Sequence, residues 1–156
     1  MAFHATRDDF GCFACLDGRK AEVSARPVEV YTVDGLLDAH VPPRVPVALL
    51  KTDTQGHEAH VLDGAAAALR AARVRAVLVE FDPRLLGRRA TGLRVLATLV
   101  GARFWCVHLA FAPAGGGALW GGGAPVTAAT AEAFYDWVVA QGGYTDLLCV
   151  HQSVGG

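Results

Sequence analysis

Short apolar runs alternate with helix-like segments over most of the chain, and this alternation limits the fold more than any other feature. Four runs have the length and composition of strands buried in a sheet: Val47–Lys51, Val74–Phe81, Phe104–Phe111 and Leu147–Gln152. Between them, three segments space apolar residues as amphipathic helices do: His57–Ala72, Thr91–Ala102 and Thr127–Gln141. Because strands and helices alternate, we predict an α/β domain with a mainly parallel sheet.

Several residues mark the expected limits of these elements. Thr91 and Thr127 stand at the starts of two predicted helices, where a threonine hydroxyl is a good N-terminal cap. Gly142 and Gly143 follow the last predicted helix and favour its termination. Residues 113–125 are rich in glycine, and we predict a loop there.

The chain before residue 47 is predicted to hold a strand and a short helix. Val28–Val33 alternates in character with the period of a half-buried strand. Asp34 is expected to cap a helix over Gly35–His40, and prolines then enforce an extended chain. The apolar segment Phe10–Leu16 is a candidate to pair with Val28–Val33 as a hairpin.

Composition argues against several functional classes. The net charge is -1 and the pI about 6.6, so no strong field is available to bind nucleic acid. No stretch is long and apolar enough to span a membrane, and the first residues do not resemble a secretory signal. The compartment therefore stays unassigned, with the cytoplasm as the default.

The cysteines and histidines give only weak signals. Cys106 and Cys149 lie inside predicted strands, where we expect free thiols that pack as small apolar groups. The motif Cys12-Phe-Ala-Cys15 has no second pair downstream, which makes zinc or redox chemistry a weak prediction. His57 and His60 lack the His-Glu-x-x-His spacing, so we predict no metal site.

One segment carries a specific motif between a predicted strand and a predicted helix. It reads Leu49-Leu-Lys-Thr-Asp-Thr-Gln-Gly-His-Glu-Ala-His-Val-Leu-Asp-Gly-Ala65. It resembles the FkbM-type methyltransferases, in which an apolar strand is followed by Lys-x-Asp-x-x-Gly-x-Glu and then by a helix with Val-Leu-x-Gly-Ala. The matching residues are Lys51, Asp53, Gly56, Glu58, Val61, Leu62, Gly64 and Ala65. The resemblance extends over roughly residues 28–83.

The resemblance implies a class I methyltransferase fold, a Rossmann-like sheet in which only the last strand is antiparallel. Val47–Lys51 would be its fourth strand and Val74–Phe81 its fifth, with the last strand inserted beside the fifth. The resemblance also implies S-adenosylmethionine as the cofactor. The implied reaction is O-methylation of a hydroxyl group on a sugar or another small molecule.

The turn after the fourth strand is the predicted site, because ligands of such folds bind at the carboxyl ends of strands. The resemblance nominates Asp53, Glu58 and Glu80 as catalytic residues, with Asp53 orienting or deprotonating the acceptor hydroxyl. Asp53, Thr54 and Gln55 are predicted to contact the cofactor.

Each charged residue of the predicted site also has a structural alternative. Asp53 or Glu58 would cap the following helix, and Glu80 would be a charge at the end of a strand. Lys51 either extends its charge into solvent or pairs with Asp53 or Glu80.

The glycine motif for the cofactor is missing from this pattern. The family's first strand should end in an acidic-x-Gly-x-x-x-Gly turn, and the only early Asp-x-Gly, Asp9-Phe10-Gly11, follows no predicted strand. We therefore predict that residues 1–156 form one partial domain without its N-terminal strands. Two functions stay open: a truncated O-methyltransferase, or a non-catalytic remnant that no longer binds the cofactor. An exposed edge of the fourth strand is expected to favour self-association.

Overall fold

Four strands form an open sheet in the computed structural model, which describes residues 3–4, 27–109 and 120–154. The strands are β3 (Leu50–Thr52), β4 (Ala76–Phe81), β5 (Phe104–Leu109) and β6 (Thr145–His151). Their order across the sheet is β3-β4-β6-β5. A separate antiparallel pair consists of β1 (Phe3–His4) and β2 (Pro27–Val28). The described part of the chain therefore has a mixed α/β fold.

The last strand lies between two others and runs against both. β3 and β4 pair in parallel, whereas β6 pairs antiparallel with β4 on one side and with β5 on the other. β3, β4 and β5 therefore share one direction, and β6 opposes it. The predicted position of an antiparallel last strand, beside the run that forms β4, is confirmed.

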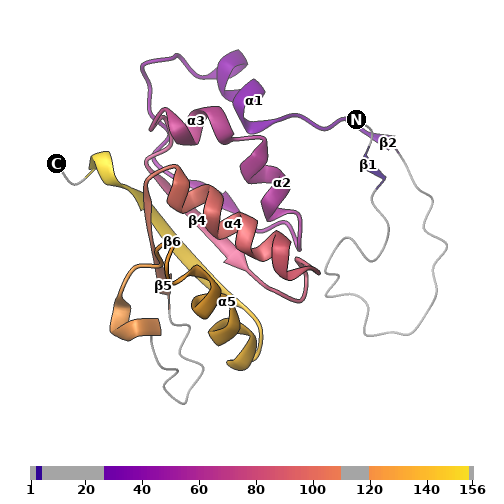
Figure 1. Cartoon of the computed structure of the whole chain (residues 1–156). Coiled ribbons are helices and arrows are strands. Elements are labelled where there is room, and N and C mark those ends of the chain that lie inside the picture. Colours follow the sequence, from indigo (N-terminus) through magenta and orange to yellow (C-terminus); the bar gives the residue numbers. More distant parts are fainter. Residues whose placement is uncertain (1–2, 5–26, 110–119, 155–156) are drawn as a thin grey trace.

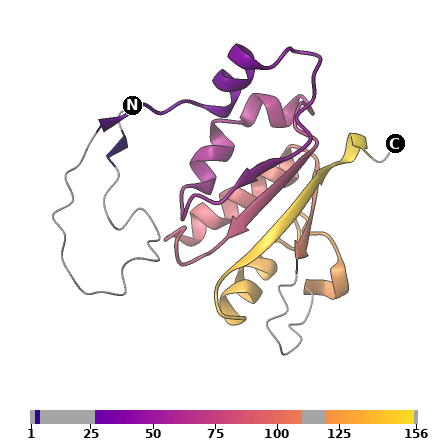
Figure 2. The same cartoon turned by 180° about the vertical axis from the view of Figure 1, so that it is seen from behind.

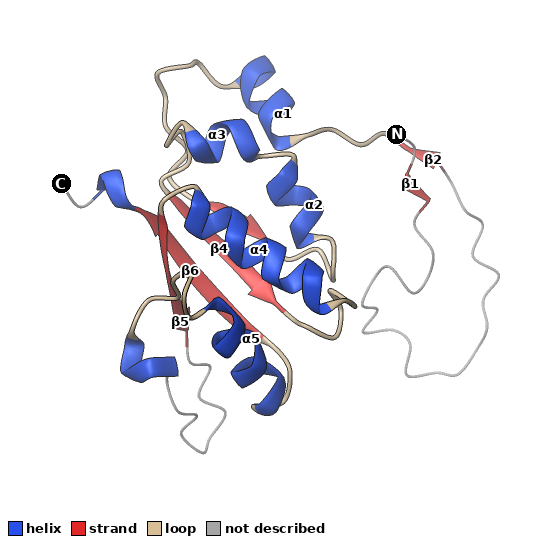
Figure 3. Ribbon diagram, viewed as in Figure 1, coloured by secondary structure: helices blue, strands red, loops and turns tan. Residues whose placement is uncertain are grey.

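The helices that connect the strands gather on one face of the sheet (Figures 1 and 3). They are α2 (Glu58–Asp63), α3 (Ala66–Arg70), α4 (Arg89–Gly101) and α5 (Ala131–Ala140), and α1 (Val33–His40) lies against α3. Seen from behind, the strands stand in front of these helices (Figure 2). Two short 3-10 turns complete the described elements, η2 (Trp120–Gly123) and η3 (Gln152–Val154).

The core lies between the sheet and these helices. In β4, Val77, Val79 and Phe81 are fully buried, whereas the residues between them are only partly covered. Each such buried side chain stabilises the fold by about 1.5–3 kcal/mol relative to an exposed one. Because successive side chains of a strand point to opposite faces, Glu80 projects away from the helices. Glu80 therefore lies on the face of the sheet that the described helices leave uncovered.

The strand predicted over Val28–Val33 is wrong. β2 ends at Val28, and α1 already begins at Val33. The hydroxyl of Thr32 caps α1 by accepting a hydrogen bond from the Gly35 amide at 3.0 Å, and this cap outweighs the alternating pattern. Phe10–Leu16 and its pairing lie outside the described residues.

The single helix predicted over His57–Ala72 is divided into α2 and α3, and Asp34 explains the division. The Asp34 carboxylate accepts hydrogen bonds from the amides of Ala67 (2.9 Å) and Ala68 (2.8 Å), at the start of α3. Its own amide donates to the carbonyl of Gly64 (2.8 Å). Asp34 was predicted to cap its own helix, but it caps a helix more than thirty residues away in the sequence.

Neither threonine predicted as an N-terminal cap has that role. α4 begins at Arg89, before Thr91, and no side chain caps it. α5 begins at Ala131, because Thr127 opens a turn in which its amide donates to the Thr130 hydroxyl at 2.9 Å. Thr127 therefore belongs to a turn that precedes α5 and does not cap the helix.

The predicted end of the last helix is confirmed. Gly142 and Gly143 follow α5 with φ values of +107° and +97°, which glycine adopts without steric cost. Of the predicted loop over residues 113–125, the part up to residue 119 lies outside the described residues, and Trp120–Gly123 forms η2.

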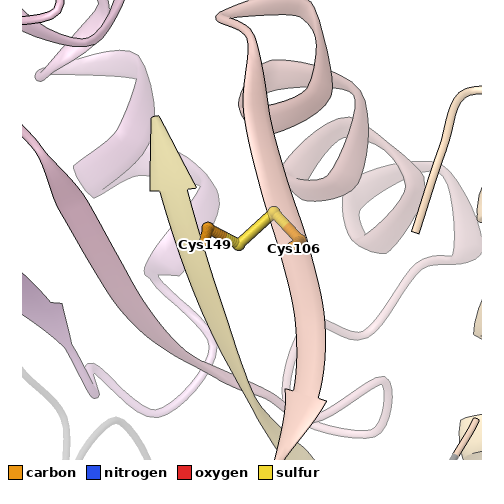
Figure 4. Close-up of a disulfide and its surroundings, with 2 residues drawn as sticks. All are labelled: Cys106 and Cys149. Atoms are coloured by element: carbon orange, nitrogen blue, oxygen red, sulfur yellow. A yellow bond between two sulfur atoms is a disulfide. The ribbon is translucent and has the colours of Figure 1, made fainter. Parts of the chain in front are cut away.

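Cys106 and Cys149 form a disulfide, so the predicted free thiols are wrong (Figure 4). They are cross-strand partners in the antiparallel pair of β5 and β6, with a Cα–Cα distance of 3.9 Å. The Cys106 carbonyl accepts a hydrogen bond from the Val126 amide (2.7 Å), on the side of β5 away from β6. The two cysteines are therefore a non-hydrogen-bonded pair, the kind in which side chains approach most closely.

Candidate active site

Two charged residues at the end of β3 form an ion pair. Side chains two positions apart on extended chain share a face, so Lys51 and Asp53 both project away from the helices. Lys51 Nζ donates to Asp53 Oδ2 at 2.9 Å. The two side chains remain 59% and 41% exposed, so water screens the pair and it contributes little to stability. The ion pair that was one alternative for Lys51 is confirmed.

The register of the sheet places Glu80 next to Asp53. β3 and β4 pair so that Thr52 is opposite Val79, and Asp53 and Glu80 are the next positions of the two segments. Gln55 spans these carboxylates, because its Nε2 donates to Asp53 Oδ1 (3.1 Å) and to Glu80 Oε2 (3.0 Å). The three side chains therefore form one cluster at the carboxyl ends of two parallel strands.

A strained turn presents Gln55 to the cluster. The φ angle is +54° at Gln55 and +101° at Gly56. A positive φ costs a residue with a side chain about 1 kcal/mol, so contacts around the turn must hold it. The buried Glu58 carboxylate accepts hydrogen bonds from the Thr54 amide (2.8 Å), the Thr54 hydroxyl (3.0 Å) and the Gly56 amide (3.0 Å).

Gly56 also lies against the neighbouring loop between β4 and α4. A Cβ atom at this position would stand 2.3 Å from the carbonyl oxygen of Leu85. The loop itself is fixed by the buried Asp82, which accepts hydrogen bonds from the amide (2.8 Å) and the guanidinium (2.8 Å) of Arg84. Two loops thus meet at the same edge of the sheet, and a glycine permits the approach.

The two carboxylates of the cluster differ in charge state. Burial raises the pKa of Glu80 to about 7, and the neighbouring Asp53 carboxylate adds to this effect. Hydrogen bonds from Lys51 and from Gln55 hold the pKa of Asp53 below its ordinary value. Asp53 is therefore ionised near neutral pH, where Glu80 takes up and releases a proton. Carboxyl groups whose pKa values are pushed apart are suited to acid–base chemistry.

Asp146 brings a third carboxylate to the site and was missed from the sequence. It is the cross-strand partner of Glu80 on β6. Burial and the Asp53 carboxylate raise the pKa of Asp146. Among the described residues, none donates a hydrogen bond to its carboxylate. The strand predicted from the sequence began at Leu147, so it did not include Asp146 or its pairing with Glu80.

Of the predicted site residues, the structure brings Asp53, Gln55 and Glu80 into contact with one another. Thr54 and Glu58 lie beneath them and bond to each other within the turn. Within the described ranges, the chain has no group of three or more His, Cys, Asp or Glu residues arranged to hold a metal ion. In those same ranges, no helix is both long enough and apolar enough to cross a membrane.

The cluster lies at the carboxyl ends of two parallel strands of an α/β protein, which is where ligands of this class of protein usually bind. The family model of the methyltransferase FkbM domain matches residues 6–104. This chain therefore belongs to the FkbM methyltransferase family. The matched residues include the Asp53–Gln55–Glu80 cluster and end before Asp146. No curated protein and no solved structure matches the chain.

Proposed function

We propose that the chain is an S-adenosylmethionine-dependent O-methyltransferase domain, which methylates a hydroxyl group of a sugar or another small molecule. One observation carries the proposal: Gln55 joins Asp53 to Glu80 inside the residues that match the family. Family membership supports methyl transfer. The cluster supports a hydroxyl as the acceptor, because a hydroxyl must lose a proton when it is methylated.

The sheet supports a class I, Rossmann-like fold for this domain. In that fold the antiparallel last strand is inserted beside the fifth strand, and here β6 pairs with β4. On this proposal β3 is the fourth strand and β4 the fifth. Residues 1–156 are proposed to form one partial domain of this type, with the ligand site at the carboxyl ends of its strands.

The charge of the site fits a cofactor with a positive centre. Asp53, Glu80 and Asp146 are electrostatically coupled to one another, and Lys51 is the cation among them. When bound, S-adenosylmethionine would supply an electrophilic methyl group on a positively charged sulfur. We infer that Asp53 faces this charge. Thr54 and Gln55 are weaker candidates for cofactor contacts, because their side-chain donors already bond to carboxylates of the chain.

Glu80 is proposed to accept the proton of the acceptor hydroxyl. The ionised carboxylate would take up this proton when the bound cofactor gives its methyl group to the hydroxyl oxygen. The products would be a methyl ether, the cofactor as a neutral thioether and protonated Glu80, so atoms and charge balance. Asp53 orients the hydroxyl, and Glu58 acts indirectly by holding the turn that carries Gln55.

Transfer of tritium from methyl-labelled S-adenosylmethionine to a panel of sugars and hydroxylated small molecules tests this function. The purified chain is expected to label at least one compound. Glu80→Gln should then lose about a hundredfold or more in rate, which is the usual contribution of a general base. Glu132→Gln, on the exposed side of α5, is the matched control and should keep the wild-type rate. A Glu80→Gln variant with the wild-type rate would exclude Glu80 as the base.

A second candidate is a non-catalytic domain that works only with a partner chain. It is favoured by the edge of the sheet, since β3 has a strand on one side only among the described residues. Open strand edges recruit other strands. If two copies paired antiparallel about Thr52, Lys51 of each copy would lie opposite Asp53 of the other, which is a charge-complementary register.

Calorimetry and sedimentation separate the two candidates. Binding of S-adenosylmethionine at roughly micromolar concentration supports the enzyme. A stable dimer without such binding supports the second candidate. For that dimer, Lys51→Glu is expected to weaken association, because it places like charges opposite each other. The double variant Lys51→Glu/Asp53→Lys should restore association.

A further inference from the structure

We propose that Gln55 is a positioning residue, which holds the carboxyl groups of Asp53 and Glu80 together as one unit. The catalytic consequence of this role rests on the proposed function, but the contacts exist in the free chain. The inference departs from the cofactor contact that the sequence resemblance implied for Gln55.

The geometry of the amide leaves its nitrogen no hydrogen-bond donor for another partner. A glutamine side chain has two N–H donors on a single nitrogen. Here that nitrogen lies 3.1 Å from Asp53 Oδ1 and 3.0 Å from Glu80 Oε2. Both donors are therefore directed at carboxylates, one from each of two neighbouring strands. A bound ligand would have to break this bridge to take a hydrogen bond from Gln55.

Each carboxylate depends on the bridge in a different way. Lys51 already holds Asp53 through its other oxygen, Oδ2, so Gln55 completes the fixation of that side chain. Among the described residues, Gln55 is the side chain that donates a hydrogen bond to the Glu80 carboxylate. Loss of the amide would leave two like-charged groups side by side without a shared donor. Such a donor favours the ionised form of a carboxyl group.

The backbone conformation of the turn does not favour glutamine at position 55, so we attribute the glutamine to the contacts of its side chain. Gln55 has a φ of +54°, a backbone conformation that glycine and asparagine adopt with less steric strain than other residues do. The turn is held by other groups, namely the Glu58 carboxylate and the contact of Gly56 with Leu85. Gln55 therefore has an unfavourable backbone conformation that its own side chain does not maintain. The contacts that its side chain does make are the two hydrogen bonds of the bridge, to Asp53 and Glu80.

Two substitutions test the bridge without disturbing the turn. Gln55→Gly removes the amide and suits the positive φ, and Gln55→Asn keeps an amide that is one methylene too short to reach both partners. The readout is the titration of the Glu80 carboxyl carbon, followed by NMR on the isotope-labelled full chain. Both variants should raise the titration midpoint of Glu80 by about half a pH unit or more, because the ionised form loses its donor.

A control and a stability measurement complete the experiment. Gln141→Ala, at the exposed end of α5, should leave the Glu80 titration unchanged. Gln55→Gly should unfold at the same urea concentration as the wild type or a higher one, because the strain at φ is relieved. An unchanged or lowered midpoint for Glu80 in Gln55→Gly would overturn the proposal. Because the titration needs no methyl transfer, a failure of the proposed function would leave this result intact and distinguishable.

Discussion

At the end of β4, Glu80 stands between the carboxyl groups of Asp53 and Asp146, on the face of the sheet away from the helices. Its partial burial removes water that would otherwise favour ionisation, and its neighbours repel a negative charge. The folded chain therefore holds a proton on Glu80 up to a pH at which an ordinary glutamate is ionised. This single position links the register of three strands to the chemistry proposed for the site.

The stability of the fold should depend on pH through Glu80. Its pKa rises from 4.5 to about 7 on folding, so the protonated form is favoured by the native state. This contribution is fully present below about pH 4.5 and is lost as the pH rises through about 7. Glu80→Gln should therefore stabilise the chain at about pH 8 by about 1 kcal/mol, a value reduced for solvent screening, with a smaller effect at about pH 5. Urea unfolding at both pH values measures this, and a larger gain at the lower pH would contradict it.

Gly56 should be intolerant of any side chain. Gly56→Ala would place a Cβ atom 2.3 Å from the Leu85 carbonyl oxygen at a φ of +101°. We expect a loss of about 3 kcal/mol in the free energy of unfolding, because both loops must move. Gly87→Ala is the matched control for positive φ without crowding, since nothing lies within 4 Å of its Cβ position, and should cost about 1 kcal/mol. Equal losses for the two variants would show that crowding at Gly56 is unimportant.

At this scale the sequence motif predicted which residues gather, but not how they bond. Asp53 and Glu80 follow from the motif and from the rule that ligand sites lie at the ends of parallel strands. The bridge made by Gln55 depends on a positive φ, and a local pattern does not predict a strained conformation for glutamine. Asp146 depends on the pairing of β6 with β4 across the sheet.

Between elements, Asp34 connects the start of α1 to the start of α3. Its carboxylate accepts hydrogen bonds from two backbone amides that have no partner within α3. Arg73 reinforces this connection, because its guanidinium donates to the carbonyls of Leu37 (2.9 Å) and Val41 (2.6 Å). α1 has no buried residue of its own. Val33 and Leu37 pack against the core while partly exposed, so these polar contacts add to a limited apolar packing.

Removal of this cap should loosen α1 and α3 together. We expect Asp34→Ala to lower the free energy of unfolding by about 1–2 kcal/mol, the usual cost of losing a helix cap. Asp38→Ala removes the exposed partner of Arg73 and should cost less than about 1 kcal/mol. Hydrogen exchange at the Ala67 and Ala68 amides should accelerate in Asp34→Ala. Unchanged exchange at these two amides would contradict the capping role.

The limits of an element were predictable where its apolar residues recur with a clear period. They were not predictable where a contact with a distant part of the sequence sets the limit. β4 and α4 fall inside or close to their predicted limits, because buried strands and amphipathic helices leave clear patterns. The division of the helix after Asp63 was not predictable, since it follows from a carboxylate more than thirty positions upstream. The strand predicted over residues 28–33 is wrong because alternation forms a strand only when one face is buried. Tyr31, in the middle of this segment, is 64% exposed.

Over the whole molecule, the Cys106–Cys149 disulfide fastens the last strand to β5. The cysteines are 43 residues apart, so the bond closes a loop that contains η2 and α5. Replacing both residues with alanine should destabilise the chain by about 2–4 kcal/mol, mainly because the unfolded chain regains freedom. Urea unfolding of the double variant and of the reduced wild type measures this. Identical midpoints for the oxidised and reduced chains would show that the bond contributes nothing.

The arrangement of the sheet brings the site together from three strands, and its most testable consequence is the titration of Glu80. NMR titration of the Glu80 carboxyl carbon in the wild-type chain should give a midpoint near 7. Asp53→Asn should lower this midpoint, because a neighbouring negative charge is removed. A wild-type midpoint near 4.5, the ordinary value, or a midpoint unaffected by Asp53→Asn would contradict the acid–base site that we propose.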